Sequence, residues 1–158
     1  MATSIFFLDL GITLIFSATE PLRYLTLVVG RFVRVLDTNF DARPGAASLP
    51  TPARTGSSQV TMMIEANPRQ TGRGREAAAT AADIMRFYAT LMGDRPYPSL
   101  NVAVVENELP GGHSPAYAVV INTPPPASQF LTRNDPAAFL GFPEFFLAHE
   151  VTHQWWGQ

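Results

Sequence analysis

The feature that most constrains this sequence is a strongly apolar stretch near its C-terminus that contains two histidines and a glutamate. From about Pro143 to the end, large apolar residues recur on every side of the helix that the pattern predicts. His149, Glu150 and His153 interrupt them. A buried cluster of this kind costs free energy unless its members are paired or bind a metal. The sequence therefore predicts a core helix that carries a functional polar group.

The spacing of the three polar residues suits a zinc site. His149 and His153 are four positions apart, so both imidazoles share one helix face. Neutral imidazole binds zinc well, and catalytic zinc usually has three protein ligands and one open position. Glu150 is rotated by roughly 100° from His149 and lies beside the metal. We expect zinc to activate a water molecule, and Glu150 to pass its proton to the leaving amine of a peptide bond.

Two simpler interpretations stay open. The same spacing arises by chance in roughly one chain in a few hundred of this length, so the helix can be purely structural. The third histidine, His113, is expected in a loop. A loop histidine is more often a hydrogen-bonding or surface residue than a metal ligand.

Composition excludes several classes of function. The 158 residues suit one domain or parts of two, and 46% are hydrophobic, which is enough for a packed core. A net charge of -2 argues against nucleic-acid binding. Without cysteine there is no disulfide or thiolate site, so zinc must be bound by His, Asp or Glu. The apolar run Ile5–Phe16 is about half as long as a membrane span and contains Asp9, so it predicts strands.

The order of elements follows from periodicity and from breaks rich in Pro and Gly. Leu22–Val29 is apolar on both faces and predicts a strand buried on both sides. Asp37–Gln59 predicts a long loop, and the polar segment Asn67–Gly74 predicts a domain boundary. The other predicted elements are strands at Ile5–Leu8, Ile12–Phe16, Phe32–Leu36, Val60–Glu65, Leu100–Glu106 and Ala116–Ile121, a helix at Arg75–Met92, a loop at Asn107–Pro115 and a helical turn at Asp135–Leu140.

The stretch 149–157 resembles the HExxHxWxG signature of the aminopeptidase N family of gluzincin zinc peptidases; it reads His149-Glu150-Val151-Thr152-His153-Gln154-Trp155-Trp156-Gly157. The resemblance implies an α+β fold in two parts. Residues 1–70 would end a β-rich, β-sandwich-like N-terminal domain. Residues 71–158 would begin a thermolysin-like catalytic domain that stops on the zinc helix. The implied cofactor is Zn²⁺, and the implied substrate is a peptide or a protein.

The resemblance also implies residues that this sequence does not include. The family takes its third zinc ligand from a Glu on a later helix, and a tyrosine that stabilises the transition state from further on. Neither position falls within residues 1–158. We therefore expect the chain to be an incomplete, inactive fragment of a zinc-dependent peptidase.

A loop upstream of the zinc helix determines specificity in the family, where it is written GxMEN and its Glu captures the substrate's amino terminus. The matching residues here, and the predicted substrate-binding residues, are Gly111, Gly112, His113 and Ser114. Ser114 stands where the acid is expected, although Glu106 or Glu108 could reach the amine. The residues therefore predict a peptidase more directly than they predict specificity for a free amino terminus. The altered loop keeps open an alternative, a catalytically silent member of the family that binds peptides or acts as a scaffold.

Overall fold

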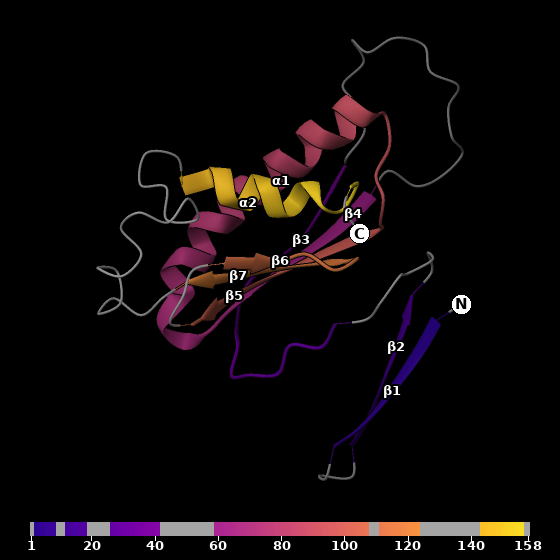
Figure 1. Ribbon diagram of the computed structural model, residues 1–158, viewed down its shortest axis with the longest axis vertical. Helices are drawn as coiled ribbons and strands as arrows, with labels where there is room; N and C mark the ends of the chain where they lie inside the picture. The colour runs from indigo at the N-terminus through magenta and orange to yellow at the C-terminus, as the bar shows by residue number, and fades with distance from the viewer. Residues whose placement is uncertain are drawn as a thin grey trace.

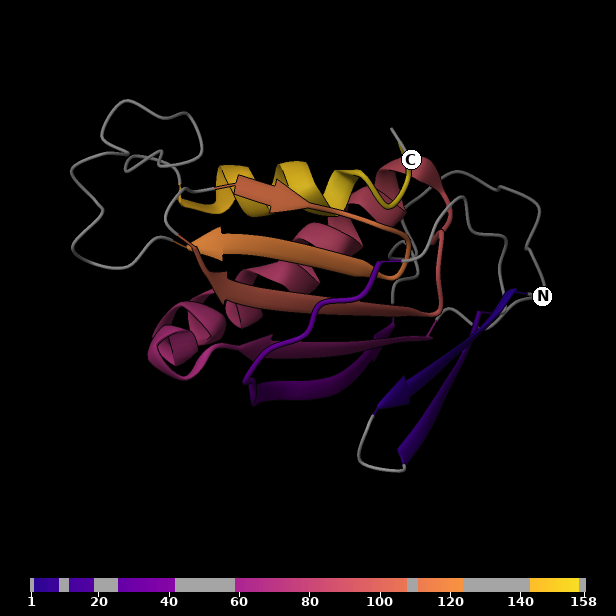
Figure 2. The same ribbon diagram turned by 60° about the horizontal axis from the view of Figure 1, so that its bottom comes forward.

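The computed structural model describes residues 2–8, 12–18, 26–41, 59–107, 111–123 and 143–156. They form a mixed α/β fold, with a five-stranded sheet, two helices and a separate two-stranded hairpin (Figures 1 and 2). The predicted mixture of helices and a sheet is confirmed. The elements are β1 (Ala2–Leu8), β2 (Ile12–Ala18), β3 (Val33–Asp41), β4 (Gln59–Ala66), the 3₁₀ turn η1 (Pro68–Gln70), α1 (Thr71–Met92), β5 (Ser99–Glu106), β6 (Gly111–His113), β7 (Ala118–Thr123) and α2 (Pro143–Thr152).

The sheet has the strand order β3-β4-β5-β7-β6. Its three central strands run parallel, and the two outer strands, β3 and β6, run antiparallel to their neighbours. The short strand β6 therefore forms one edge of the sheet, and it lies next to α2 (Figure 2). This edge brings the loop predicted to bind substrate alongside the predicted zinc helix.

Alternation along the central strands determines which face of the sheet is buried. In register across the sheet, Ile64 pairs with Val102 and Val102 pairs with Val119, and all three side chains are fully buried. Both helices cover this face and contribute to one hydrophobic core. The buried core residues from the helices are Ala81, Met85 and Ala89 of α1 and Leu147 and Val151 of α2.

Helix α1 starts earlier than the sequence predicts, at Thr71 rather than Arg75. Gly74, which we expected in a polar break, is buried in the first turns of the helix. A Cβ atom there would lie 3.0 Å from Val35 and 3.1 Å from Ala66. The glycine thus allows the helix to pack closely on the sheet. The predicted end is confirmed, because Gly93 closes the helix in the left-handed conformation (φ 73°).

Other expectations about strands and loops are wrong or fall outside the described residues. In the predicted strand Leu22–Val29, residues 26–29 have no regular structure and are exposed. They pair with none of the described strands, and an apolar pattern alone cannot supply a partner. The predicted loops Asp37–Gln59 and Asn107–Pro115 contain the end of β3 and all of β6. β6 forms because two glycines can still pair through their backbone with β7. The predicted turn Asp135–Leu140 lies outside the described residues.

The division into domains at residues 70 and 71 stays a prediction, but the five-stranded sheet includes strands from both sides of it. Within the described residues, the N-terminal segment forms the hairpin β1–β2, and no β-sandwich is seen. Neither described helix is both long and apolar enough to cross a membrane.

Candidate metal and catalytic site

The helix that carries the motif, α2, buries only one side. Leu147 and Val151 pack in the core, whereas Phe145 and Trp156, which follows the helix, are 56% and 43% exposed. The expectation of a helix buried all round is therefore wrong. The reason is that the sheet and α1 lie against one side of α2 and no other described residues cover the opposite side (Figure 1).

The helix also ends before the second histidine rather than continuing to the end of the chain. Its last residue is Thr152. After it, the backbone N–H groups of His153, Gln154 and Trp155 each donate to the carbonyl three residues earlier, at 2.9–3.2 Å. Such bonds tighten the last turn of a helix. The indole of Trp155 donates to the carbonyl of Asp94 at 3.2 Å, which anchors this turn to the end of α1.

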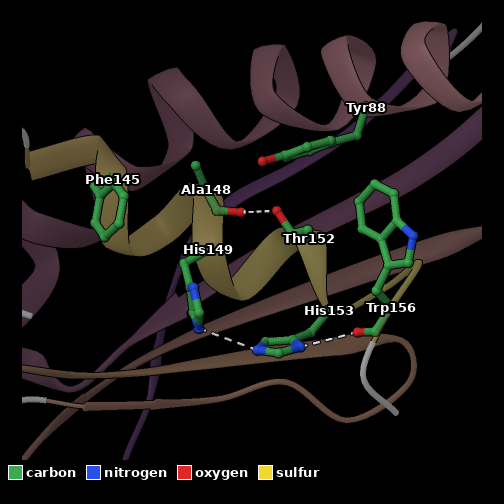
Figure 3. A pocket seen from close by; sticks show the side chains of 7 residues that line it. All are labelled: Tyr88, Phe145, Ala148, His149, Thr152, His153 and Trp156. Atoms are coloured by element: carbon green, nitrogen blue, oxygen red, sulfur yellow. Dashed lines mark hydrogen bonds between the residues drawn. The ribbon is translucent and has the colours of Figure 1, made fainter.

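The tight turn brings the two histidines together. Nε2 of His153 lies 3.3 Å from Nε2 of His149, and the two rings are nearly perpendicular, at 88° (Figure 3). Nδ1 of His153 is 3.0 Å from the carbonyl oxygen of Trp156 (Figure 3). That oxygen can only accept a hydrogen bond, so Nδ1 carries the proton and Nε2 of a neutral ring has a free lone pair. A backbone carbonyl in this position fixes the tautomer of metal-binding histidines.

The geometry of the pair fits a zinc ion. Two nitrogen ligands at about 2.0–2.1 Å in a tetrahedral arrangement are about 3.3–3.4 Å apart. The observed separation of the two Nε2 atoms, 3.3 Å, matches this value. The same distance also allows a long hydrogen bond in which His149 donates to His153. The separation of the two nitrogens is therefore compatible with a shared metal ion and also with a metal-free contact.

A pocket of about 290 Å³ opens beside the histidine pair. Tyr88 reaches over it from α1, and aromatic rings from α2 and the following turn line its other sides (Figure 3). The lining residues are Tyr88, Phe145, Ala148, His149, Thr152, His153 and Trp156. This environment offers apolar contact to a ligand and imidazole nitrogens at one side.

Within the described part of the chain, no group of three or more His, Asp or Glu residues is arranged to hold a metal ion. The histidine pair provides two ligands of the three that a catalytic zinc needs.

Glu150 lies on the buried side of α2 and is only 5% exposed. Its carboxylate accepts a hydrogen bond from the hydroxyl of Ser114. The carboxylate also fills the space next to Gly112, where a Cβ atom would overlap it. Edge strand β6 and the residue that follows it therefore hold the predicted base against the sheet.

The other predicted loop residues have different surroundings. A Cβ atom at Gly111 would be 3.6 Å from Asn122, which is an ordinary contact. His113 is exposed, and its Nε2 lies 3.3 Å from the hydroxyl of Thr26. The structure thus separates His113 from the histidine pair and brings Gly112 and Ser114 to Glu150.

Of the two expected substitutes for the missing loop acid, Glu106 is bound away from the histidine pair. Glu106 accepts hydrogen bonds from the guanidinium group of Arg69 at 2.9 and 3.0 Å and from Gln70 at 3.3 Å. These contacts tie the end of β5 to the turn before α1. Glu108 lies outside the described residues.

Sequence reasoning missed the role of Gln154, which is 3% exposed and connects α2 to the turn before β7. Its Oε1 accepts a bond from the N–H of Tyr117 at 3.1 Å, and its Nε2 donates to the carbonyls of Pro115 and Ala118 at 3.2 and 3.0 Å. The signal available in the sequence was an amide directly after the motif, on the same helical face as Val151. A buried amide requires hydrogen-bond partners.

We expect Gln154→Ala to lower the free energy of unfolding by about 2–4 kcal/mol, because the N–H of Tyr117 and the carbonyls of Pro115 and Ala118 each lose a hydrogen bond. A matched control is Gln70→Ala. Gln70 is equally buried but makes one long bond, at 3.3 Å, so about 1 kcal/mol is expected there. Urea unfolding of the full-length variants measures both values. A cost for Gln154→Ala that does not exceed that of Gln70→Ala would contradict this role.

No protein-family model matches this chain, and neither a curated protein nor a solved structure matches it. The resemblance to a peptidase family therefore rests on the motif residues of the sequence and stays a prediction.

Proposed function

We propose that this chain carries part of the active site of a zinc-dependent peptidase of the aminopeptidase N type. The observation that carries the proposal is the pair of Nε2 atoms, 3.3 Å apart, on the histidines of an HExxH motif. We further infer that the sheet, with its edge strand β6 beside α2, begins a thermolysin-like domain. An edge strand next to the catalytic helix suits a substrate that binds as an added strand.

His149 and His153 would hold the zinc through Nε2. When bound, zinc supplies a Lewis acid that polarises the scissile carbonyl and activates water. Glu150 accepts the proton of the attacking water as the new C–O bond forms. It then delivers the proton to the amine nitrogen as the C–N bond breaks. The aromatic pocket beside the histidines is suited to an apolar side chain of the peptide.

A catalytically silent peptide-binding protein is the alternative. The observation in its favour is that Ser114 replaces the loop acid and that its hydroxyl is already bonded to Glu150. Such a protein would bind zinc and peptide and would release no product. A chance motif, in contrast, would bind no stoichiometric zinc.

We expect the full-length protein, purified without an affinity tag that binds metal, to contain about one zinc per chain. Removal of zinc with 1,10-phenanthroline should abolish the hydrolysis of a fluorogenic peptide, and added zinc should restore it. Elemental analysis and a peptidase assay measure the two quantities. The full-length protein is used because the resemblance implies a third ligand on a helix that follows the histidine pair. Zinc well below one equivalent would exclude the proposed function.

A further inference from the structure

The surroundings of Glu150 suggest how its position is determined. Its carboxylate is buried at the junction of α2 and β6. A buried carboxylate is stable only where hydrogen bonds replace its water. The hydroxyl of Ser114, itself only 6% exposed, donates to Oε2. This hydrogen bond therefore offsets part of the free energy that it costs to bury the carboxylate.

Ser114 is in turn held in a fixed place. It is followed by a turn in which the N–H of Ala118 donates to the carbonyl of Pro115 at 3.0 Å. Tyr117, the third residue of this turn, has a φ of 69°, which is uncommon for a residue with a side chain. The three hydrogen bonds of Gln154 to this turn hold that conformation. The loop that presents Ser114 is thus rigidly attached to the same helix end that carries the motif.

Gly112 lies against the same carboxylate. Its position against the carboxylate leaves no room for a Cβ atom, whereas the position of Gly111 does. Any larger residue at 112 would push Glu150 away from β6. The glycine is therefore required by the position of the carboxylate.

We propose that Ser114 is a positioning residue for the general base, an inference that rests on the proposed function. Its hydroxyl donates to Oε2 of Glu150, while Oε1 packs against Gly112. Gly112 provides the space in which the carboxylate is held. The sequence assigned Ser114 to the substrate, at the place of an acid that captures an amino terminus. The geometry assigns it to Glu150 instead.

The first test uses the kinetics of the zinc-loaded full-length protein. Ser114→Ala should lower kcat by about 10–100-fold, the usual effect of losing a hydrogen bond that orients an active-site group, and leave KM within about twofold. Ser114→Thr keeps the hydroxyl and should recover most of kcat. The matched control is Thr80→Ala, which removes a hydroxyl bonded at 2.9 Å to a carbonyl of α1, away from the site. It should leave both constants unchanged.

The second test needs neither zinc nor activity. In the metal-free full-length protein, melting temperatures are measured for Ser114→Ala, Glu150→Ala and the double variant, because alanine at 150 removes both carboxylate oxygens and therefore the contact with Ser114. Groups in contact give non-additive effects, so the double variant should lose less than the sum of the single variants, by a few degrees. Strict additivity would show that the two side chains do not act on each other and would overturn the inference.

The outcomes separate this inference from the proposed function. If Glu150→Gln abolishes hydrolysis and Ser114→Ala leaves kcat unchanged, the positioning role is wrong and the proposed function stands. If Ser114→Ala raises KM with kcat unchanged, Ser114 binds substrate as the sequence predicted. If Glu150→Gln keeps the wild-type rate, the proposed function fails, and the thermal cycle alone decides whether the contact between the two side chains exists.

Discussion

Glu150→Gln is expected to lower kcat for peptide hydrolysis by about 10²–10⁴-fold, the usual contribution of a general base. Glutamine has the same shape as glutamate and still offers an oxygen to the hydroxyl of Ser114. It cannot accept the proton from water. The fold and the zinc content should therefore stay unchanged while the chemical step is lost. Steady-state hydrolysis of a fluorogenic peptide by the zinc-loaded full-length protein measures the effect.

The matched control for this variant is Glu144→Gln, on the same helix. Glu144 is exposed in the first turn of α2, where its charge favours the positive end of the helix dipole. Its loss should cost about 0.3–1 kcal/mol of stability and leave kcat unchanged. A wild-type rate in Glu150→Gln would show that Glu150 is not the base. A protein that binds zinc but hydrolyses no peptide, even before mutation, would favour the catalytically silent alternative.

Local patterns in the sequence predicted the elements whose signal is contained in their own residues. The alternating strands β4 and β5 and the helix α1 with its terminal Gly93 are of this kind. In each element, the spacing of apolar side chains indicates which residues are buried, or a residue of the same segment indicates where the element ends. The two glycines of β6 have no side chains to alternate, so the edge strand could not be recognised. It forms because β7 supplies a partner.

The two histidines of the candidate site could also be predicted from the spacing of residues within one segment. Their contacts with residues far away in the sequence could not. The four-residue spacing of His149 and His153 places both rings on one face, and the structure brings their Nε2 atoms to 3.3 Å. The sequence did not show which side of the helix faces the sheet. That side determines that Glu150 meets Ser114 and that Gln154 enters the turn before β7. Such contacts join residues more than thirty positions apart, and only the packing of α2 on the sheet relates them.

The second large effect is expected on metal binding when either histidine of the pair is replaced. The zinc-binding free energy of a structural site with four protein ligands is about 10–16 kcal/mol, so one protein ligand contributes about 3 kcal/mol. His149→Ala and His153→Ala should each weaken zinc binding in the full-length protein by a hundredfold or more, since ~1.4 kcal/mol corresponds to a factor of ten. Competition with a chromophoric chelator measures the affinity.

His113→Ala is the matched control, because it removes the third imidazole of the chain, which contacts Thr26 and lies apart from the pair. It should leave the zinc affinity unchanged. The melting temperature in the presence of zinc gives a second test. A ligand that binds only the folded state raises the stability of that state by about 2.7 kcal/mol at a free concentration 100 times Kd. Added zinc should therefore raise the melting temperature of the wild type and of His113→Ala, and leave that of His149→Ala and His153→Ala nearly unchanged. An equal rise in all four proteins would mean that zinc binds elsewhere and that the 3.3 Å contact is only a hydrogen bond between two imidazoles.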